Sequence, residues 1–346
     1  MINKNKTVEY DSKNDNRNDN KDDNRDDNKN EHSKVKAPPA PLLSVNELKV
    51  SFGMYQKGLK KGLKKDMLTV IQNLSLEVCS GEIVAIVGSS GSGKSLLAHA
   101  ILGILPNNAA VDGQIIYDGQ ELTKSRQKQL RGTEIALIPQ SVEYLDPLMR
   151  VGKQVVGVHG SEKKRRDVFK RYGLGEQAAS MYPFQLSGGM ARRVLIGTAV
   201  TITPRLIVAD EPTPGLSADL ASETLENFRE LADKGAAVLL ITHDVDLALN
   251  VADKIAVFYA GTTVEIAPAE DFKAGAHALR HPYSKAFIDA LPQNGFTPIA
   301  GKQPYAGLLP GGCLFADRCS MRTDSCSGEI AMRDLHGGKV RCINAT

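Results

Sequence analysis

Apolar residues gather in short runs along the chain, and most runs end at polar or glycine-rich segments. Runs of about four to eight such residues bounded by turn residues predict buried strands. These runs are residues 83–87, 134–139, 206–211 and 238–242, and residues 42–52 show strand-like alternation. Helical patterns are predicted at 95–105, at 161–172 and from Met190. The pattern therefore predicts an α/β fold.

Length and composition bound the architecture. The 346-residue chain is long enough for one α/β domain of about 230 to 250 residues with appendages at both ends. Its net charge of +3 argues against strong nucleic-acid affinity. It contains neither an apolar stretch of about 18 residues nor an N-terminal apolar signal region. We therefore expect a cytoplasmic protein whose membrane association comes through a partner.

The N-terminal segment differs in composition from the rest of the chain. Residues 1–36 consist largely of Asn, Asp, Lys and Arg in near repeats, and residues 37–41 are rich in proline. This segment has too little apolar surface to offset the entropy that it would lose on ordering. We therefore predict a disordered tail. Residues 54–66 carry five lysines and are predicted to form a hairpin tip.

A glycine-rich loop joins the strand at 83–87 to the helix at 95–105. Its eight residues fit the phosphate-loop pattern of nucleotide-binding proteins, and they are Gly88, Ser89, Ser90, Gly91, Ser92, Gly93, Lys94 and Ser95. The glycines let successive backbone N–H groups face phosphate oxygens at a helix N-terminus. In this pattern Lys94 neutralises the β and γ phosphates and Ser95 ligates Mg²⁺. We therefore predict a nucleotide site.

Two carboxylates, Asp210 and Glu211, end the predicted strand at 206–211. They lie at the carboxyl end of the strand, where open α/β sheets bind ligands. Asp210 is predicted to hold Mg²⁺ through its water shell, and Glu211 to polarise the attacking water as general base. An acidic pair at a strand end is often only a solvated turn, but the upstream phosphate loop favours the catalytic interpretation.

A third motif, Ser187-Gly188-Gly189, lies between the phosphate loop and the acidic pair. A hydroxyl and two glycines before a helix present hydrogen-bond donors to an anion. The order of the three motifs resembles the ATP-binding subunits of ABC transporters. The resemblance implies that the anion is the γ phosphate of ATP held by an opposite subunit, so that two chains stack head to tail around two nucleotides.

The same resemblance assigns further residues to the site. His243 follows the apolar run 238–242, and the resemblance implies that it contacts the γ phosphate. Gln140 matches the family glutamine that reaches toward Mg²⁺ and the attacking water. The family stacks the adenine on an aromatic residue from a strand before the phosphate loop. Phe52 and Tyr55 are the candidates for that role.

Two residues depart from the usual family pattern. Met190 replaces the commoner glutamine after the Ser-Gly-Gly motif, a variant typical of peptide-type importers. Ser217 stands where the family usually places Asp, which puts communication between two sites in doubt. Asp219 lies nearby and could compensate.

The resemblance also implies a division into domains. Residues 1–41 are predicted to form the tail and its join. Residues 42–275 form a P-loop NTPase domain of the ABC type, with an antiparallel β subdomain and a helical subdomain at about 141–185. Residues 276–346 form a C-terminal extension. Residues 281–284 and 313–319 resemble the extension of oligopeptide, dipeptide and nickel importer ATPases.

Four of the five cysteines fall in this extension, at positions 313, 319, 326 and 342. Cytosolic cysteines stay reduced and favour metal over disulfide. The intervals of five, six and fifteen residues are wider than in zinc ribbons, which favours a [4Fe-4S] cluster over Zn²⁺. Unligated thiols are the third alternative. The candidate ligands are Cys313, Cys319, Cys326 and Cys342.

These observations predict an ATPase that energises uptake of peptides or nickel complexes from the cytoplasmic face of the cell membrane. The implied partners are a second ABC ATPase of related sequence, two membrane permeases and an extracytoplasmic binding protein. Two alternatives remain open at the sequence level. One is a soluble ABC ATPase acting on nucleic acid or ribosomes, and the other is a nucleotide-regulated metal or redox sensor.

Overall fold

The computed structural model describes residues 40–57, 63–89 and 91–346, and for 55–57 and 63–66 it describes the backbone alone. The predicted disordered tail, Ser90 of the phosphate loop and the side chains of Tyr55 and of the five hairpin lysines lie outside the described residues. Within the described part of the chain, no helix is long and apolar enough to cross a membrane.

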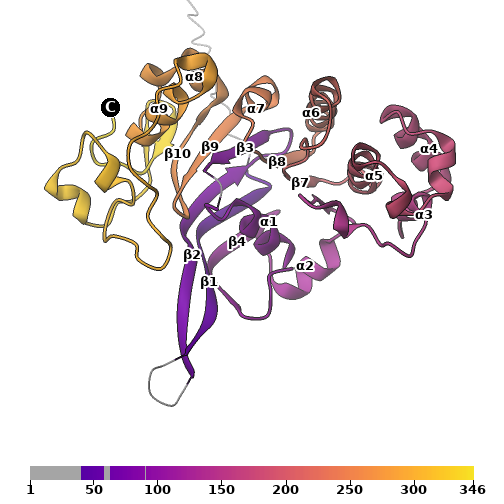
Figure 1. The fold of residues 1–346 in the computed structure, drawn as a ribbon, viewed down its shortest axis with the longest axis horizontal. Coiled ribbons are helices and arrows are strands. Elements are labelled where there is room, and N and C mark those ends of the chain that lie inside the picture. Colours follow the sequence, from indigo (N-terminus) through magenta and orange to yellow (C-terminus); the bar gives the residue numbers. More distant parts are fainter. Residues whose placement is uncertain (1–39, 58–62, 90) are drawn as a thin grey trace, which may run out of the picture. The chain divides into compact units, whose positions relative to one another are not determined.

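A mixed sheet organises the chain, with the strand order β5-β4-β1-β2-β10-β9-β3-β8-β7-β6 (Figure 1). The run β9-β3-β8-β7-β6 is parallel, whereas β1 pairs antiparallel with β2 and β4. The strands are β1 (Leu43–Lys57), β2 (Leu63–Val78), β3 (Ile83–Gly88), β4 (Ala109–Tyr117), β5 (Gln120–Glu121), β6 (Ile135–Ile138), β7 (Leu206–Asp210), β8 (Ala237–Ile241), β9 (Lys254–Tyr259), β10 (Thr262–Pro268), β11 (Arg333–Leu335) and β12 (Gly338–Val340). This α/β fold with an antiparallel β subdomain confirms the fold class predicted from the sequence.

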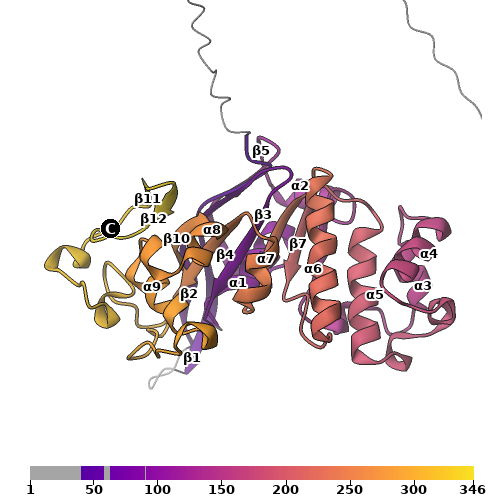
Figure 2. The same ribbon diagram turned by 90° about the horizontal axis from the view of Figure 1, so that it is seen from above.

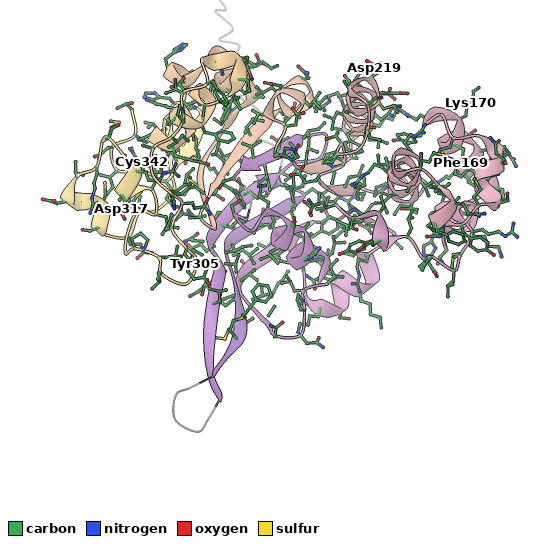
Figure 3. All side chains as sticks on the ribbon, viewed as in Figure 1. Phe169, Lys170, Asp219, Tyr305, Asp317 and Cys342 are labelled. Carbon is green, nitrogen blue, oxygen red and sulfur yellow. The ribbon has the colours of Figure 1, made fainter. Side chains whose placement is uncertain are left out.

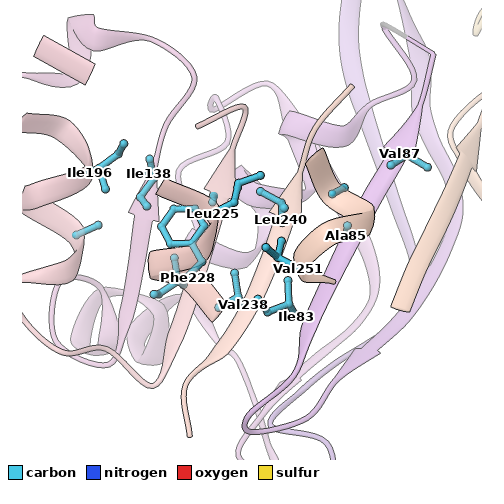
Figure 4. Close-up of a cluster of buried hydrophobic side chains, with 14 of the residues drawn as sticks. Ile83, Ala85, Val87, Ile138, Ile196, Leu225, Phe228, Val238, Leu240 and Val251 are labelled. Carbon is cyan, nitrogen blue, oxygen red and sulfur yellow. The ribbon is translucent and has the colours of Figure 1, made fainter. Parts of the chain in front are cut away.

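The parallel strands are buried on both faces, which explains why they read as unbroken apolar runs. Successive side chains of a strand point to opposite faces. On β3, Ile83, Ala85 and Val87 therefore join one core cluster, whereas Val84 and Ile86 join the other. Figure 4 shows the first cluster, in which β3 and β8 residues pack against α6 and α7.

Helices connect many of these strands along the chain and pack beside the sheet (Figure 2). The α-helices are α1 (Lys94–Leu102), α2 (Lys124–Leu130), α3 (Val151–Val156), α4 (Glu162–Arg171), α5 (Gly188–Val200), α6 (Ala218–Asp233), α7 (Val245–Val251), α8 (Ala269–Ala274) and α9 (Pro282–Asp289). The short 3₁₀ turns are η1 (Val142–Tyr144), η2 (Glu176–Ser180), η3 (Pro183–Gln185), η4 (Ala276–Ala278), η5 (Pro292–Asn294), η6 (Ala316–Arg318) and η7 (Asp324–Ser327). The segment from η1 to η3 is helical without strands, as the sequence predicts for the helical subdomain.

The C-terminal residues are joined to the sheet by strand pairing and by a buried ion pair. In β12, Val340 and Lys339 lie opposite Glu265 and Ile266 of β10. The fully buried Glu265 carboxylate accepts the backbone N–H groups of Arg280 and His281, at 2.8 Å each. The Arg280 guanidinium lies 3.4 Å from the same carboxylate. Because a buried carboxylate needs this many donors, the start of α9 is fixed to β10.

Candidate functional site

The phosphate loop connects β3 to α1, as predicted. Gly88 has φ 150°, and a Cβ atom at this position would lie 2.3 Å from the Phe258 carbonyl oxygen of β9. Gly93, the N-cap of α1, has the left-handed φ of 95° that favours glycine. Both positions therefore require glycine, one for space and the other for backbone conformation.

Lys94 is buried under this loop. Its Nζ donates hydrogen bonds to the carbonyl oxygens of Gly88 at 2.9 Å and Ser89 at 3.0 Å. Burial lowers the pKa of Lys94, and the carboxylates of Glu211 and Asp210 oppose that shift. The ammonium thus lies between the loop and the acidic pair, in the position that a phosphate-binding lysine needs.

Asp210 ends β7 with a side chain that is almost completely buried. Burial raises the pKa of the Asp210 carboxyl, and a hydrogen bond with Ser95 opposes the shift. Its Oδ1 atom is buried with no hydrogen-bond partner. A buried carboxylate oxygen left without a donor, beside a serine hydroxyl, suits a hard cation. Two of the three predicted Mg²⁺ residues, Asp210 and Ser95, therefore meet, and their chemistry fits that ion.

Glu211 follows directly and holds a strained backbone conformation. Its φ of 49° lies in the left-handed region, which costs a non-glycine residue roughly 1–2 kcal/mol. The backbone N–H of Glu211 donates to the Ile241 carbonyl oxygen of β8 at 2.9 Å, which holds the turn in place. The Glu211 carboxylate lies 2.7 Å from His243 Nδ1. Strain of this kind is characteristic of functional sites, where it aims a side chain.

Lys94, Glu211 and His243 line one cavity of 670 Å³ beside the phosphate loop, whereas Asp210 is not among its lining residues. The cavity is large enough for a nucleotide. His243 is 69% exposed and Glu211 9% exposed, so the imidazole faces the solvent while the carboxylate lies deeper. The lining residues are Val70, Gly91, Gly93, Lys94, Ser95, Leu96, Gln140, Glu211, Ile241 and His243. The structure therefore brings the three residues predicted for catalysis together with Gly91, Gly93, Lys94 and Ser95 of the phosphate loop.

Phe52 is not among the residues that line this cavity, and the side chain of Tyr55 lies outside the described residues, so adenine stacking on either residue stays a prediction. In the β1–β2 ladder Phe52 lies opposite Leu68, and its side chain packs against the core cluster on that face of the sheet. Val70 of β2 lines the cavity instead.

The Ser187-Gly188-Gly189 motif lies outside the cavity, at the start of α5. Ser187 is the N-cap of this helix, and its hydroxyl accepts the Met190 N–H at 3.3 Å. Ser187 and Gly188 are exposed, and a Cβ atom at Gly188 would meet nothing within 4 Å. The motif thus faces open space at a helix N-terminus, where it can reach an anion held by another molecule.

Arg192 is a site residue that the sequence reasoning missed. It is buried in α5, and it donates hydrogen bonds to the carbonyl oxygens of Pro139 at 3.0 Å and Gln140 at 2.6 Å. The helix bearing the exposed motif is thereby tied to the glutamine of the cavity. The sequence carried a signal, because Arg192 shares a helix face with Leu195 and Ile196, and a charge on an apolar face needs buried partners.

Ser217, the departure from the family pattern, lies at the start of α6. Ser217 is the N-cap of α6, but its side chain makes no capping hydrogen bond. Asp219 lies in the first turn of this helix, where a negative charge complements the helix dipole (Figure 3). In this single chain neither residue lines the cavity.

The four C-terminal cysteines are reduced and influence one another electrostatically. The Cys313 N–H donates to the Cys326 carbonyl oxygen at 2.8 Å, which brings two of the loops together. Burial raises the pKa of Cys313 and Cys319, and raises that of Cys342 to about 11. Among the described residues, no three His, Cys, Asp or Glu side chains are close enough to hold a metal ion. As placed here, the thiols form no such group, so the iron–sulfur or Zn²⁺ site stays a prediction.

Comparisons with known proteins agree with this geometry. Residues 71–214 match the ABC transporter family, and residues 264–326 match the oligopeptide/dipeptide transporter C-terminal region. The dipeptide transport ATP-binding protein DppD of Escherichia coli (strain K12) is 36% identical over 310 residues, which cover 83% of this chain and 91% of that protein. The oligopeptide transport ATP-binding protein AppD of Bacillus subtilis (strain 168) is 32% identical over 87% of this chain and 96% of that protein.

A solved structure, the dimeric post-hydrolysis ATP-binding cassette MJ0796 bound to ADP and Pi, shares the fold. Its TM-score is 0.56 at 23% identity, and the match covers 66% of this chain and 98% of that chain. The chain therefore belongs to the ABC transporter ATP-binding subunits that carry the oligopeptide/dipeptide transporter C-terminal region, and whose ATP hydrolysis is coupled to transport.

Proposed function

We propose that this chain hydrolyses ATP, as one of two ATPase subunits, to energise the uptake of peptides. The observation that carries the proposal is an incomplete site. Part of the phosphate loop, Glu211, Gln140 and His243 share one cavity, whereas Ser187 lies exposed outside it. A second ATPase subunit that contributes its own Ser-Gly-Gly motif would close the cavity around the γ phosphate.

The residues divide the work of hydrolysis as follows. Lys94 neutralises the β and γ phosphates from beneath the loop. Ser95 and Asp210 would hold Mg²⁺, which when bound withdraws charge from the phosphate oxygens. Glu211 orients a water molecule and takes its proton as the oxygen bonds to the γ phosphorus and the bond to ADP breaks. His243, hydrogen-bonded to Glu211, and Gln140 position that water and the γ phosphate.

The surface of the helical segment, from η1 to η3, is the evidence for a membrane partner. This surface exposes large apolar side chains, which a protein keeps at an interaction site. Four of them lie at η1 and η3 or just beyond η1, namely Tyr144, Leu148, Met149 and Phe184. We propose that these residues dock on two permease subunits, which places the chain at the cytoplasmic face of the membrane.

The cargo is proposed to be a peptide, because the relatives of this chain include dipeptide and oligopeptide transport proteins. The test is a mild-detergent pull-down of the chain from its native membrane, followed by mass spectrometry. Recovery of a second ATPase and two permeases supports the importer, and the accompanying binding protein is then titrated with peptides and with Ni²⁺. Selective Ni²⁺ binding would show that the cargo is nickel and not a peptide. Recovery of ribosomes or nucleic acid would overturn the transport function.

The cysteines remain a proposed metal centre on the strength of their chemistry. Four thiols within one short segment are the donor set of a [4Fe-4S] cluster, but binding one requires the loops to draw the sulfur atoms closer. Anaerobic purification followed by iron, acid-labile sulfide and zinc analysis tests this. Stoichiometric iron and sulfide would support the cluster, zinc alone would support a structural Zn²⁺ site, and neither would leave four free thiols.

A further inference from the structure

The phosphate loop is touched by the C-terminal extension. Ser89, the second residue of the loop, donates a hydrogen bond from its hydroxyl to Oε1 of Gln303. The hydroxyl of Tyr283, on α9, lies close enough to the same serine that the Ser89 side chain and backbone lower the pKa of Tyr283 against the effect of burial. Two residues from beyond the cassette therefore converge on one residue of the nucleotide site, across 194 and 214 positions of sequence.

Gln303 is held in place by Arg318. The Arg318 guanidinium donates to the carbonyl oxygens of Ile299 at 3.0 Å and Ala300 at 2.7 Å, just before Gln303. It also donates to the Tyr259 hydroxyl at 3.2 Å, so the segment is tied to β9 beside the loop. One side chain thus fixes the path of the chain that delivers Gln303 to Ser89.

Tyr283 is held by aromatic packing. It is buried, and its ring lies 4.5 Å from that of Tyr259 and 5.3 Å from that of Phe315 between ring centroids. Burial raises the pKa of Tyr283 to about 12, so its hydroxyl stays protonated at neutral pH. Neither contact to Ser89 therefore depends on a charged group. Packing against Tyr259 and Phe315 fixes the orientation of the Tyr283 ring and therefore the position of its hydroxyl.

We propose that Tyr283 and Gln303 act as a clamp that pre-forms the phosphate loop and thereby sets its affinity for ATP. The loop contains three glycines, and binding phosphate must order them at an entropic cost. Fixing Ser89 before the nucleotide arrives lowers that cost, and pre-organisation of this kind raises affinity. Tyr283 and Gln303 are positioning residues, since they act through Ser89 without touching the reacting atoms. The inference rests on the nucleotide site described above.

The test compares Tyr283→Phe and Gln303→Ala in the full chain, using Mg-ATP binding by calorimetry and steady-state hydrolysis. Removing one hydrogen bond should weaken ATP affinity by about three- to tenfold. KM for ATP should rise equally, while kcat changes by less than about twofold, because the reacting groups are untouched. The controls are Tyr305→Phe and Lys302→Ala, at exposed positions of the same segment.

Two further variants, Arg318→Ala and its combination with Gln303→Ala, test whether Arg318 supports the clamp. Arg318→Ala should reproduce the affinity loss of Gln303→Ala, and combining the two should add little, because both release one contact. The control Arg322→Ala removes an exposed arginine that pairs only with Asp317 among the described residues. Unchanged ATP affinity in Tyr283→Phe and Gln303→Ala would overturn the clamp, as would a fall in kcat alone. A wild-type chain that fails to bind Mg-ATP would instead overturn the nucleotide function.

Discussion

At the residue scale, Glu211 is the group whose removal should separate binding from hydrolysis. Glu211→Gln keeps the size of the side chain and removes its basicity, so ATP binding should persist while hydrolysis falls by about 100-fold or more. Binding by calorimetry and phosphate release by the assembled ATPase pair measure the two effects. Glu223→Gln, on the exposed face of α6, is the matched control. Unimpaired turnover in Glu211→Gln would remove the residue from the general-base role.

The backbone of Glu211 permits a second test, of strain. Glycine adopts the left-handed region freely, so Glu211→Gly should be more stable than Glu211→Gln by about 1 kcal/mol, although both lack the carboxylate. Thermal or urea unfolding of the nucleotide-free proteins measures the difference. If the glycine variant is the less stable of the two, the φ of 49° is not a strained conformation.

The buried Asp210 carboxylate is expected to lower the stability of the nucleotide-free chain at neutral pH while it supports Mg²⁺-dependent hydrolysis. Its carboxyl has a raised pKa in the folded state, so it contributes most to stability at pH values below its unfolded pKa, and this contribution is lost as pH rises through the folded pKa. Asp210→Asn should therefore stabilise the nucleotide-free chain at neutral pH and lose Mg²⁺-dependent hydrolysis at least about tenfold. Unfolding at neutral and acidic pH, with and without Mg-ATP, checks both effects. A destabilised variant at neutral pH would contradict the burial argument.

At the element scale, the joint between β10 and α9 should be acid-sensitive. His281 is the N-cap of α9, and its Nδ1 accepts the Tyr283 N–H at 2.9 Å. Burial lowers the pKa of His281 from 6.5 to about 3. The neutral imidazole thus contributes stability above about pH 6.5, and this contribution is lost as pH falls toward about 3.

His281→Asn keeps a capping side chain but cannot titrate in this range. The stability of this variant should therefore fall less steeply than that of the wild type as pH decreases from 6.5. Urea unfolding at several pH values provides the slopes, and His277→Asn, at an exposed position, is the control. Equal slopes for His281→Asn and the wild type would mean that the buried imidazole is not the acid-sensitive group.

Elements with strong local signals were predictable from the sequence. The apolar run at 83–87 became β3, and the runs at 206–211 and 238–242 became β7 and β8, because a strand buried on both faces leaves an unbroken apolar pattern. The helix predicted from Met190 begins two residues earlier, at Gly188, since Ser187 caps it. The register that places Phe52 opposite Leu68 depends on pairing with β2, which one strand's pattern does not contain.

At the scale of the whole molecule, contacts between distant segments were not predictable. Nothing near Gln303 or Ser89 in the sequence indicates that they meet, because their approach depends on tertiary contacts such as those of Arg318 with Ile299 and Ala300. The candidate catalytic residue Glu211 was predicted from its place beside a motif of fixed local spacing, and Gln140 and His243 from the family resemblance. The clamp and the Arg192 tie are specific to the tertiary structure and leave no such motif.

The proposed pairing with a different ATPase leads to a complementation test. Lys94→Ala disables the cavity of this chain, and Ser187→Arg blocks the surface it would offer to a partner's nucleotide. If the chain paired with itself, mixing the two variants would create dimers with one intact composite site, and hydrolysis would partly recover. We expect no recovery, because each composite site requires one surface from the related ATPase. Phosphate release by mixed and separate variants measures this, and recovery in the mixture without the second ATPase would establish a homodimer.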